Sequence, residues 1–350
     1  MENSNVYIIA QKIAYFSSDI QLYFALPGVL INIFHLIILS QKAMRVNAIN
    51  VILIGVSISD IVFLMFYVHG HVMDLLNAGI DVKCIPPATW LQVLVYWIFQ
   101  YSKDTSRRVS TWLGVIMALI RSIVMRYSTN QRVRVLLRPW TSVNLLLSVI
   151  LVSFLLSSLN WARMQIYKFP SWVPPEICSM YPPNTTFPHY ELTQNVILSE
   201  WHYEITESFL LFDGVVKLVP PLLYPFLTGI LILELKRAKN IRLELQNQFS
   251  ERRTEENTTK IVICMTVSYF LAEAPIGLSY ILQYIWFDNF DMVVFINNIS
   301  IVCITILMLH CSGHCLICFL LNSQYRKTIA VLFGCNNRQI ANSNNLSITF

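Results

Sequence analysis

The fold depends on one stretch of the sequence, WLQVLVYWIFQYSKDTSRRVSTWLGVIMALIRSIVM, which covers residues 90–125. Its two ends, residues 90–99 and 109–125, are apolar, but each is shorter than the roughly 20 residues that a helix needs to cross a bilayer. Between them lie four charged residues and no Pro or Gly that would break a helix. The stretch therefore predicts one long transmembrane helix whose polar section faces the interior of a bundle. The alternative is a re-entrant segment in which a short loop joins two half-spans.

Six further runs of the sequence are long and apolar enough to cross a membrane as helices. They cover residues 22–40, 49–68, 140–159, 209–233, 261–285 and 293–321. The composition agrees, because 55% of the residues are hydrophobic and only 13% are charged, whereas a soluble protein has about 25% charged residues. We therefore predict an all-α membrane protein built as a bundle of seven transmembrane helices.

The placement of Lys and Arg predicts the orientation of the spans, because cytoplasmic loops carry an excess of these residues. Of the 25 Lys and Arg residues, only four, Lys12, Lys83, Arg163 and Lys168, lie in one set of connections, whereas sixteen lie in the other. The larger set is Lys42, Arg45, Arg126, Arg132, Arg134, Arg138, Lys236, Arg237, Lys239, Arg242, Arg252, Arg253, Lys260, Arg326, Lys327 and Arg338. With seven spans, the N-terminus is then outside and the C-terminus inside.

Three residues outside the spans are candidates for covalent modification on the outer side. Cys84 and Cys178 are the two cysteines of that side, where the surroundings are oxidising, so we predict a disulfide that ties the second outer loop to the top of the third helix. Asn184 begins an Asn-Thr-Thr glycosylation sequence on the same loop. On the inner side, Cys335 follows an amphipathic stretch after the last span and is a candidate palmitoylation site.

Ionisable residues inside the membrane are costly to bury, so each of them is a candidate for function. They include Lys103, Asp104 and Arg107 in the third span, Lys217 in the fifth and Glu273 in the sixth. Glu273 could pair with one of the cations, which would lower the cost of burying both. We predict that these five residues form a ligand pocket. The alternative is an ion-pair network with a structural role alone.

The outer loops and span ends are rich in carboxylates. They carry Asp74, Asp81, Glu176, Glu191, Glu200, Glu204, Glu207, Asp288 and Asp291. The field of such a surface attracts a cationic ligand, for example an amidated peptide with Arg or a free amine. Ordinary solvation of the loops is the alternative.

Several motifs give the chain a family resemblance. They are SRRVSTWLGVIMALIR at residues 106–121, AEAP at 272–275, and HCLIC at 314–318 followed by NSQYR at 322–326. With these motifs the chain resembles the rhodopsin-like G-protein-coupled receptors over about residues 20–335. More narrowly, it resembles the nematode class-W serpentine chemoreceptors, which are related to FMRFamide-type peptide receptors.

The resemblance implies roles for individual residues. Asn32 matches the Asn of the first helix, and Asp60 with Ser110 matches a pair that holds a sodium ion in the wider group. Arg121 matches the Arg that faces the G protein, and Pro275 matches the proline at the kink of the sixth helix.

The sequence departs from the wider group at several of these motifs. Ile120 and Ser122 replace the acid and the Tyr that flank the Arg, and Glu273 stands where a Trp is usual. His314, with Cys315 and Cys318, replaces the Asn, Pro and Tyr of the seventh helix, which makes His314 a candidate switch residue. These departures put the sodium site and the usual switch details in doubt.

The resemblance also suggests how the inner end is held closed. Either Glu255 or Glu256 lies about five helical turns below Pro275, within reach of Arg121. A resting pair between Arg121 and Glu255 would close the cytoplasmic cleft, and loss of the pair would raise basal signalling. A solvated carboxylate without this role is the alternative.

These observations lead to a functional prediction. We expect an extracellular N-terminus at residues 1–20, a seven-transmembrane receptor domain at 21–322 and a cytoplasmic tail at 323–350 that begins with a short amphipathic helix. The expected protein is a multi-pass receptor of the plasma membrane that binds a peptide and activates a heterotrimeric G protein. The alternatives are a receptor for small odorants and, third, a channel or transporter. No enzyme motif, cofactor, metal-ligand cluster or nucleic-acid-binding basic run is evident.

Overall fold

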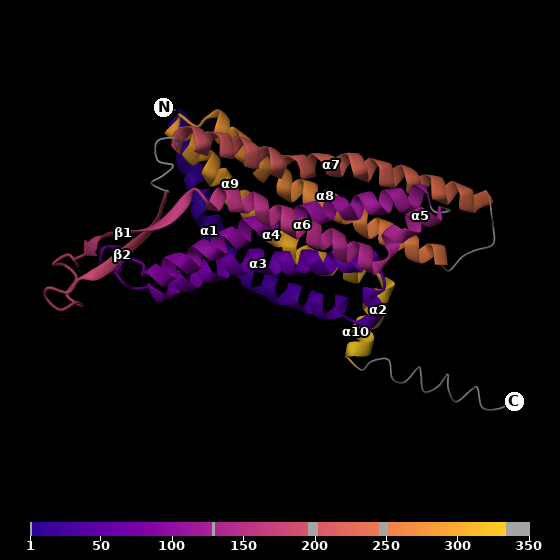
Figure 1. Ribbon diagram of the computed structural model, residues 1–350, viewed down its shortest axis with the longest axis horizontal. Helices are drawn as coiled ribbons and strands as arrows, with labels where there is room; N and C mark the ends of the chain where they lie inside the picture. The colour runs from indigo at the N-terminus through magenta and orange to yellow at the C-terminus, as the bar shows by residue number, and fades with distance from the viewer. Residues whose placement is uncertain (1, 128–129, 195–201, 245–250, 334–350) are drawn as a thin grey trace.

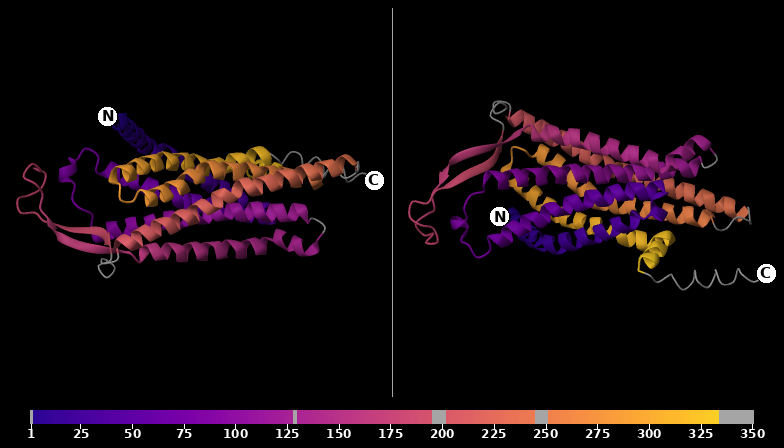
Figure 2. Two further views of the ribbon diagram at one scale, coloured as in Figure 1. Left: turned by 90° about the horizontal axis from the view of Figure 1, so that it is seen from above. Right: turned by 60° about the horizontal axis from the view of Figure 1, so that its bottom comes forward.

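The chain forms an elongated bundle of helices with a β-hairpin at one end (Figure 1). The computed structural model describes residues 2–127, 130–194, 202–244 and 251–333. We call the end that carries the hairpin the outer end, in accordance with the charge asymmetry of the loops. The two further views in Figure 2 show the same long helices running side by side between the two ends.

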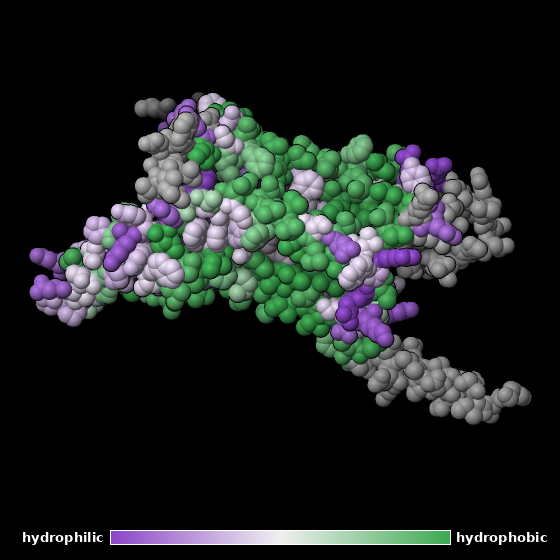
Figure 3. All heavy atoms as spheres, in the orientation of Figure 1, coloured by the Kyte–Doolittle hydropathy of each residue, from purple (hydrophilic) through white to green (hydrophobic). Residues whose placement is uncertain are grey.

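Seven helices of the described residues are long and apolar enough to cross a membrane. They are α1 (Glu2–Leu39), α3 (Ala48–Leu76), α4 (Trp90–Arg126), α6 (Pro139–Trp161), α7 (His202–Glu244), α8 (Glu251–Ile285) and α9 (Phe290–Leu321). The predicted seven-helix membrane bundle is confirmed. Figure 3 shows why it suits a bilayer: a hydrophobic surface runs along the middle of the molecule, and hydrophilic residues gather toward its two ends.

Helix α4 confirms that residues 90–125 form one continuous rod rather than a re-entrant loop. Its start is fixed by a capping box, in which the Thr89 side chain accepts from the backbone of Gln92 and the Gln92 side chain accepts from the backbone of Thr89. Within the spans, 72% of the α4 segment is buried against 17% of the α6 segment. Helix α4 is therefore the central rod of the bundle, and α6 faces lipid.

Helix α1 begins much earlier than the apolar run at residues 22–40 predicts. The additional outer turns pack against α9, where the Tyr7 hydroxyl lies 3.1 Å from the Met292 sulfur and the Tyr7 ring meets Phe295 edge-on. Apolar residues continue into these turns, among them Val6, Ile9 and Ile13. The sequence prediction placed the start of this helix too late because it required an unbroken apolar run.

A short helix follows the last span, as predicted. This helix, α10 (Ser323–Leu332), starts at Asn322, whose side chain accepts from the backbone N–H groups of Gln324 and Tyr325. Tyr325 is fully buried, and its hydroxyl lies 2.7 Å from Nδ1 of His35 on α1. Burial raises the pKa of the Tyr325 phenol well above its usual range, so this hydroxyl stays neutral and holds α10 against α1.

Within the described parts of the connections there are four further short helices and one hairpin. The helices are α2 (Lys42–Arg45), η1 (Val82–Cys84), α5 (Gln131–Arg134) and η2 (Val135–Leu137). The hairpin pairs β1 (Met164–Trp172) with β2 (Phe187–Gln194) in antiparallel register, from Met164 opposite Gln194 to Trp172 opposite Phe187. The sequence analysis expected an all-α fold and did not foresee these strands.

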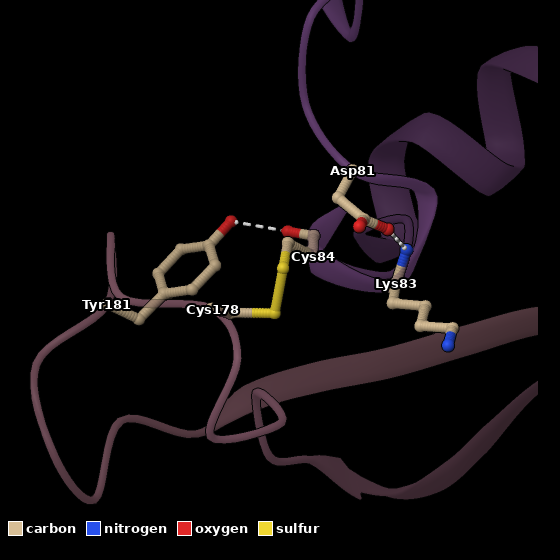
Figure 4. The surroundings of a disulfide bond; sticks show 5 residues. All are labelled: Asp81, Lys83, Cys84, Cys178 and Tyr181. Carbon is tan, nitrogen blue, oxygen red and sulfur yellow. Dashed lines mark hydrogen bonds between the residues drawn. A yellow bond between two sulfur atoms is a disulfide. The ribbon is translucent and has the colours of Figure 1, made fainter.

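The disulfide between Cys84 and Cys178 is present, as predicted, with the two Cα atoms 5.5 Å apart (Figure 4). Beside it, the Tyr181 hydroxyl donates to the Cys84 carbonyl at 2.9 Å, and the Asp81 carboxylate accepts from the backbone N–H of Lys83 at 2.9 Å. These contacts attach the loop beyond β1 to the segment just before α4. The hairpin is thereby held at the outer end of the central rod.

The apolar interior falls into two clusters. The larger one surrounds the inner half of α4 and includes Leu113, Met117, Tyr224 and Tyr269. The smaller one joins α1, α3, α8 and α9 and includes Phe63, with Ala25, Leu64, Ile276 and Met308. The charged section of α4 lies to the outer side of the larger cluster.

Candidate functional site

The charged section of α4 connects this helix to two of its neighbours. Arg107 and Arg108 are both buried, at 7% and 6% exposure. Because successive residues of a helix point about 100° apart, the two guanidinium groups face different helices. Arg107 Nη2 lies 2.9 Å from Glu273 Oε2 on α8, and Arg108 Nη2 lies 2.7 Å from Asp213 Oδ1 on α7. The cation partner predicted for Glu273 is therefore Arg107.

The Arg108 pair belongs to a larger network. Asp213 Oδ2 also accepts from Lys217 Nζ at 2.5 Å, one helical turn further along α7. Arg108 Nη1 donates to Ser157 Oγ at 2.8 Å and to the Ser153 carbonyl at 3.2 Å, both on α6. Lys217 Nζ lies 3.6 Å from the centre of the Tyr280 ring on α8. The Asp213 carboxylate thus holds two cations, and through these cations the network connects α4 and α7 with α6 and α8.

Lys103 and Asp104 lie apart from these networks. Lys103 Nζ donates to Gln100 Oε1 at 3.0 Å and lies 4.2 Å from the centre of the Phe66 ring on α3. Among the described residues, neither Lys103 nor Asp104 has an ion pair within 4.0 Å. Both side chains are partly exposed. Of the five predicted pocket residues, the structure therefore brings together Arg107, Lys217 and Glu273 and leaves the other two to one side.

A small cavity lies where the two networks approach each other, between α4, α7 and α8. Its walls are formed by four charged side chains and four others, namely Arg107, Arg108, Lys217 and Glu273 with Thr111, Trp112, Val216 and Pro220. The accessible space is about that of a single water-sized body. Burying charged side chains inside a membrane costs free energy, and residues buried at such a cost are candidates for a functional site.

Asp60, the acid of the predicted sodium site, is buried at 2% exposure. Asp60 Oδ1 accepts from Ser110 Oγ at 3.0 Å, and His314 Nδ1 lies 2.9 Å from Asp60 Oδ2, outside hydrogen-bond geometry. The other ring nitrogen of His314 lies 3.1 Å from Nε2 of His310. His314 thus lies against one side of the carboxylate, on a helix that the sequence prediction did not connect with it. The sodium site stays a prediction.

Below this layer, two stacked tyrosines connect α7 and α8 to α4. The rings of Tyr224 and Tyr269 lie 5.4 Å apart, and the Tyr224 hydroxyl donates to the Thr111 carbonyl at 2.5 Å. Gly114 makes room for them, because a Cβ at this position would lie 2.6 Å from Tyr224 Oη and 3.0 Å from Tyr269 Cε2. Tyr269 Oη also lies 3.2 Å from Ser110 Oγ. The charged outer section and the inner half of α4 are thus in continuous contact with the same two helices.

The remaining predicted residues lie toward the inner end or outside the bundle. Arg121 is 5% exposed near the inner end of α4. Pro275 lies within α8, which continues through it. Glu255 belongs to α8, but its side chain lies outside the described residues, as does the whole of Cys335. Asn184 is exposed in the loop between the strands, with φ of 65°. The lock, glycosylation and palmitoylation therefore stay predictions.

Sequence reasoning missed Asp213, the carboxylate that holds Arg108 and Lys217. The signal was present, because Asp213 precedes Lys217 by four residues, the spacing at which helical side chains of opposite charge meet. Asp213 is easily overlooked because it lies near the start of an apolar run, between the outer loop and the middle of the span. The Ser153 carbonyl and Ser157 had no comparable signal, because their role depends on how α6 packs on α4.

Seven membrane-spanning helices, a disulfide-tied outer loop and buried charges in the outer half of the bundle define the protein as a seven-transmembrane receptor. The family model described as serpentine type 7TM GPCR chemoreceptor Srw matches residues 19–336. The chain therefore belongs to this family of serpentine chemoreceptors, which confirms the family resemblance and makes the protein a multi-pass membrane protein. None of the curated proteins compared with the chain matches it.

Proposed function

We propose that the protein is a chemosensory receptor that detects an external peptide and activates a heterotrimeric G protein. The observation that carries the proposal is the pair of buried ion networks, Arg107–Glu273 and Arg108–Asp213–Lys217. They link the central helix α4 to α7 and α8, the two helices that also form the Tyr224–Tyr269 stack below. A ligand that changes these pairs acts directly on the contacts between α4 and its two neighbours.

The outer hairpin favours a peptide as the ligand. It projects beyond the ends of the helices, and the disulfide attaches the loop beyond β1 to the segment just before α4 (Figures 1 and 4). Aromatic side chains occupy its loop end, where Trp172, Tyr181 and Phe187 pack on one another. Such a surface offers both backbone hydrogen bonds at a strand edge and apolar contacts, the combination by which extended peptides are held.

The mechanism follows from differential contacts. A ligand shifts a receptor between two arrangements only by as much as it binds one of them better. Competition of a ligand group for Glu273 or Asp213 weakens a contact of α4 with α8 or α7, and the freed helices can then repack around the Tyr224–Tyr269 stack. At the inner end, movement of α8 relative to Arg121 opens the surface that a G protein contacts.

A receptor for a small odorant is the second candidate. A larger and mostly apolar hollow between α7 and α8 favours it, because such a hollow offers space for a compact molecule. This hollow is lined by Ser208, Leu211, Phe212, Val215 and Tyr284. The two candidates differ in their need for the hairpin. Shortening β1 and β2 abolishes a peptide response but leaves the response to a small molecule bound in this hollow.

The proposal is tested by expressing the chain in cultured cells and screening amidated peptides and volatile compounds with calcium and cAMP readouts. Once a response is found, Glu273→Gln is compared with the double variant Arg107→Gln/Glu273→Gln at matched surface expression. The single variant leaves Arg107 buried without its carboxylate, whereas the double variant removes both charges. A ligand site predicts that both variants lose the response. A normal dose–response curve in the double variant would remove Glu273 from the ligand site.

A further inference from the structure

The two buried networks do not balance in charge. Arg107, Arg108 and Lys217 are three buried cations, whereas Glu273 and Asp213 are two buried carboxylates. Within these two networks, one positive charge therefore has no carboxylate to match it. The third buried carboxylate among the described residues, Asp60, lies outside them, against Ser110 and His314. An unmatched charge is costly within a membrane, so the site favours binding of an anion.

Hydrogen-bond donors are also in excess around the cavity. Arg107 has five N–H donors, of which one, on Nη2, makes a side-chain hydrogen bond within the described residues, to Glu273. Arg108 uses Nη1 and Nη2, but its buried Nε has no partner among the described atoms. Both arginines line the cavity together with Lys217. A buried donor without an acceptor is rare in proteins, and a bound acceptor at this point would satisfy it.

We infer that the cavity lined by Arg107, Arg108 and Lys217 is a binding site for a small monovalent anion. The cavity has room for a body little larger than a water molecule, which excludes a large anion and leaves chloride, or one oxygen of a terminal carboxylate group, as the occupant. Arginine fits this role because its donors form a rigid fork that matches carboxylate oxygens. The inference rests on the proposed function only if the bound carboxylate is part of the receptor's ligand. In that case the acidic group is the part of the ligand that enters this cavity.

This site adds a second requirement to the ligand. The outer loops carry carboxylates such as Glu191 and Asp288, which attract a cationic group. The cavity below takes an anionic group, so a ligand that fills both presents a positive outer portion and an acidic tip. A peptide that is amidated at its end and has no acidic side chain would reach the outer portion alone, and free chloride would then occupy the cavity.

The site is tested on the purified full-length receptor in detergent, without agonist or G protein. Sodium gluconate, whose anion is too large for the cavity, is replaced stepwise at constant ionic strength by chloride in one series and by formate in another. Thermal unfolding is followed with a thiol-reactive dye, because Cys303, Cys311 and Cys318 are buried in the folded chain. We expect a saturable rise of about 2–4 °C in Tm. A rise with chloride alone identifies free halide as the occupant, and a rise with formate identifies a carboxylate.

Two variants connect the effect to the cavity. Lys217→Met removes the excess positive charge and leaves Asp213 paired with Arg108, whereas Val216→Leu adds one methylene to the cavity wall and keeps every charge. Both should lose the anion-dependent rise. Lys168→Gln, which removes an exposed charge from β1, should keep it. The inference is overturned if the unaltered receptor shows no saturable rise, or if the rise persists in both cavity variants. Because the assay needs no agonist, failure here is distinct from failure of the receptor proposal.

Discussion

The outer and inner halves of the bundle bury their polar residues in different ways. In the outer half, Arg107, Arg108, Asp213, Lys217 and Glu273 form two ion networks that join α4 to α6, α7 and α8. In the inner half, the larger apolar cluster surrounds α4. Within the described residues, Arg121 is the one buried Lys or Arg of that half. Helix packing in the outer half thus depends on ion pairs, and helix packing in the inner half depends on close apolar contacts. The outer half should therefore be sensitive to changes of charge and the inner half to changes of side-chain size.

The largest expected effect is the loss of the shared carboxylate. Asp213→Ala leaves Arg108 and Lys217 buried together without an anion, which should cost about 3–5 kcal/mol. The measurement is surface expression and Tm of the purified receptor. Adding Lys217→Met to Asp213→Ala removes one of the stranded cations and should recover part of the loss. A single variant as stable as the unaltered chain would break the contrast between the two halves.

The next effect concerns the connection of the hairpin to the bundle. Replacing both Cys84 and Cys178 by Ser removes the covalent link between the segment before α4 and the outer loop, which should cost about 2–4 kcal/mol. Because the bond lies outside the bundle, we expect the response to a peptide to fall more steeply than surface expression. A receptor that expresses poorly but responds fully per molecule would show that the bond has a structural role alone.

Shape should dominate in the inner half. Gly114→Ala places a methyl group against Tyr224 and Tyr269 without any change of charge, which should cost about 1–3 kcal/mol. The matched control is Gly229→Ala on α7, where a Cβ would meet nothing within 4 Å and the effect on Tm should be small. Equal Tm values for the two variants would contradict the view that close packing specifies this half.

The smallest expected effect on stability is that of the predicted lock at the inner end. Glu255→Ala should leave Tm nearly unchanged, because an ion pair near a surface contributes about 0.5–1 kcal/mol. The same energy corresponds to a rise of about two- to fivefold in basal signalling if the pair holds the cleft shut. Basal cAMP and calcium are compared with Glu251→Ala, a carboxylate one helical turn further from Pro275, at matched surface expression. Unchanged basal signalling would remove the lock.

The comparison also shows which features a sequence can reveal. The seven spans follow from apolar length and helix continuity, so residues 90–125 could be assigned to one helix despite their charges. The cation partner of Glu273 could be anticipated because an unpaired buried charge is costly, but the choice of Arg107 over Arg108 depends on how α4 is rotated in the bundle. The pairing of Asp213 with Arg108 could not be predicted either, because it depends on the rotation of α4 and on how closely α6 and α7 pack against it.

Two other features lay beyond the sequence for different reasons. The strands β1 and β2 are rich in aromatic residues, yet their pairing depends on a turn and a disulfide that hold distant segments together. The match to a sodium site was implied by residues Asp60 and Ser110, but the position of His314 against the carboxylate depends on the packing of α9 on α3. A motif identifies side chains, whereas tertiary contacts decide which of them meet.

The disulfide has a consequence for how the chain is made. Its two cysteines are separated by 94 residues, and both α4 and α6 lie between them. The bond can therefore form in the oxidising lumen only after these two helices have crossed the membrane in opposite directions and returned the second loop to that side. An inverted or uninserted α4 would leave one thiol in the reducing cytosol. Formation of this disulfide therefore depends on correct insertion of α4. A chain with a misinserted α4 would keep two free thiols, which cellular quality control can detect.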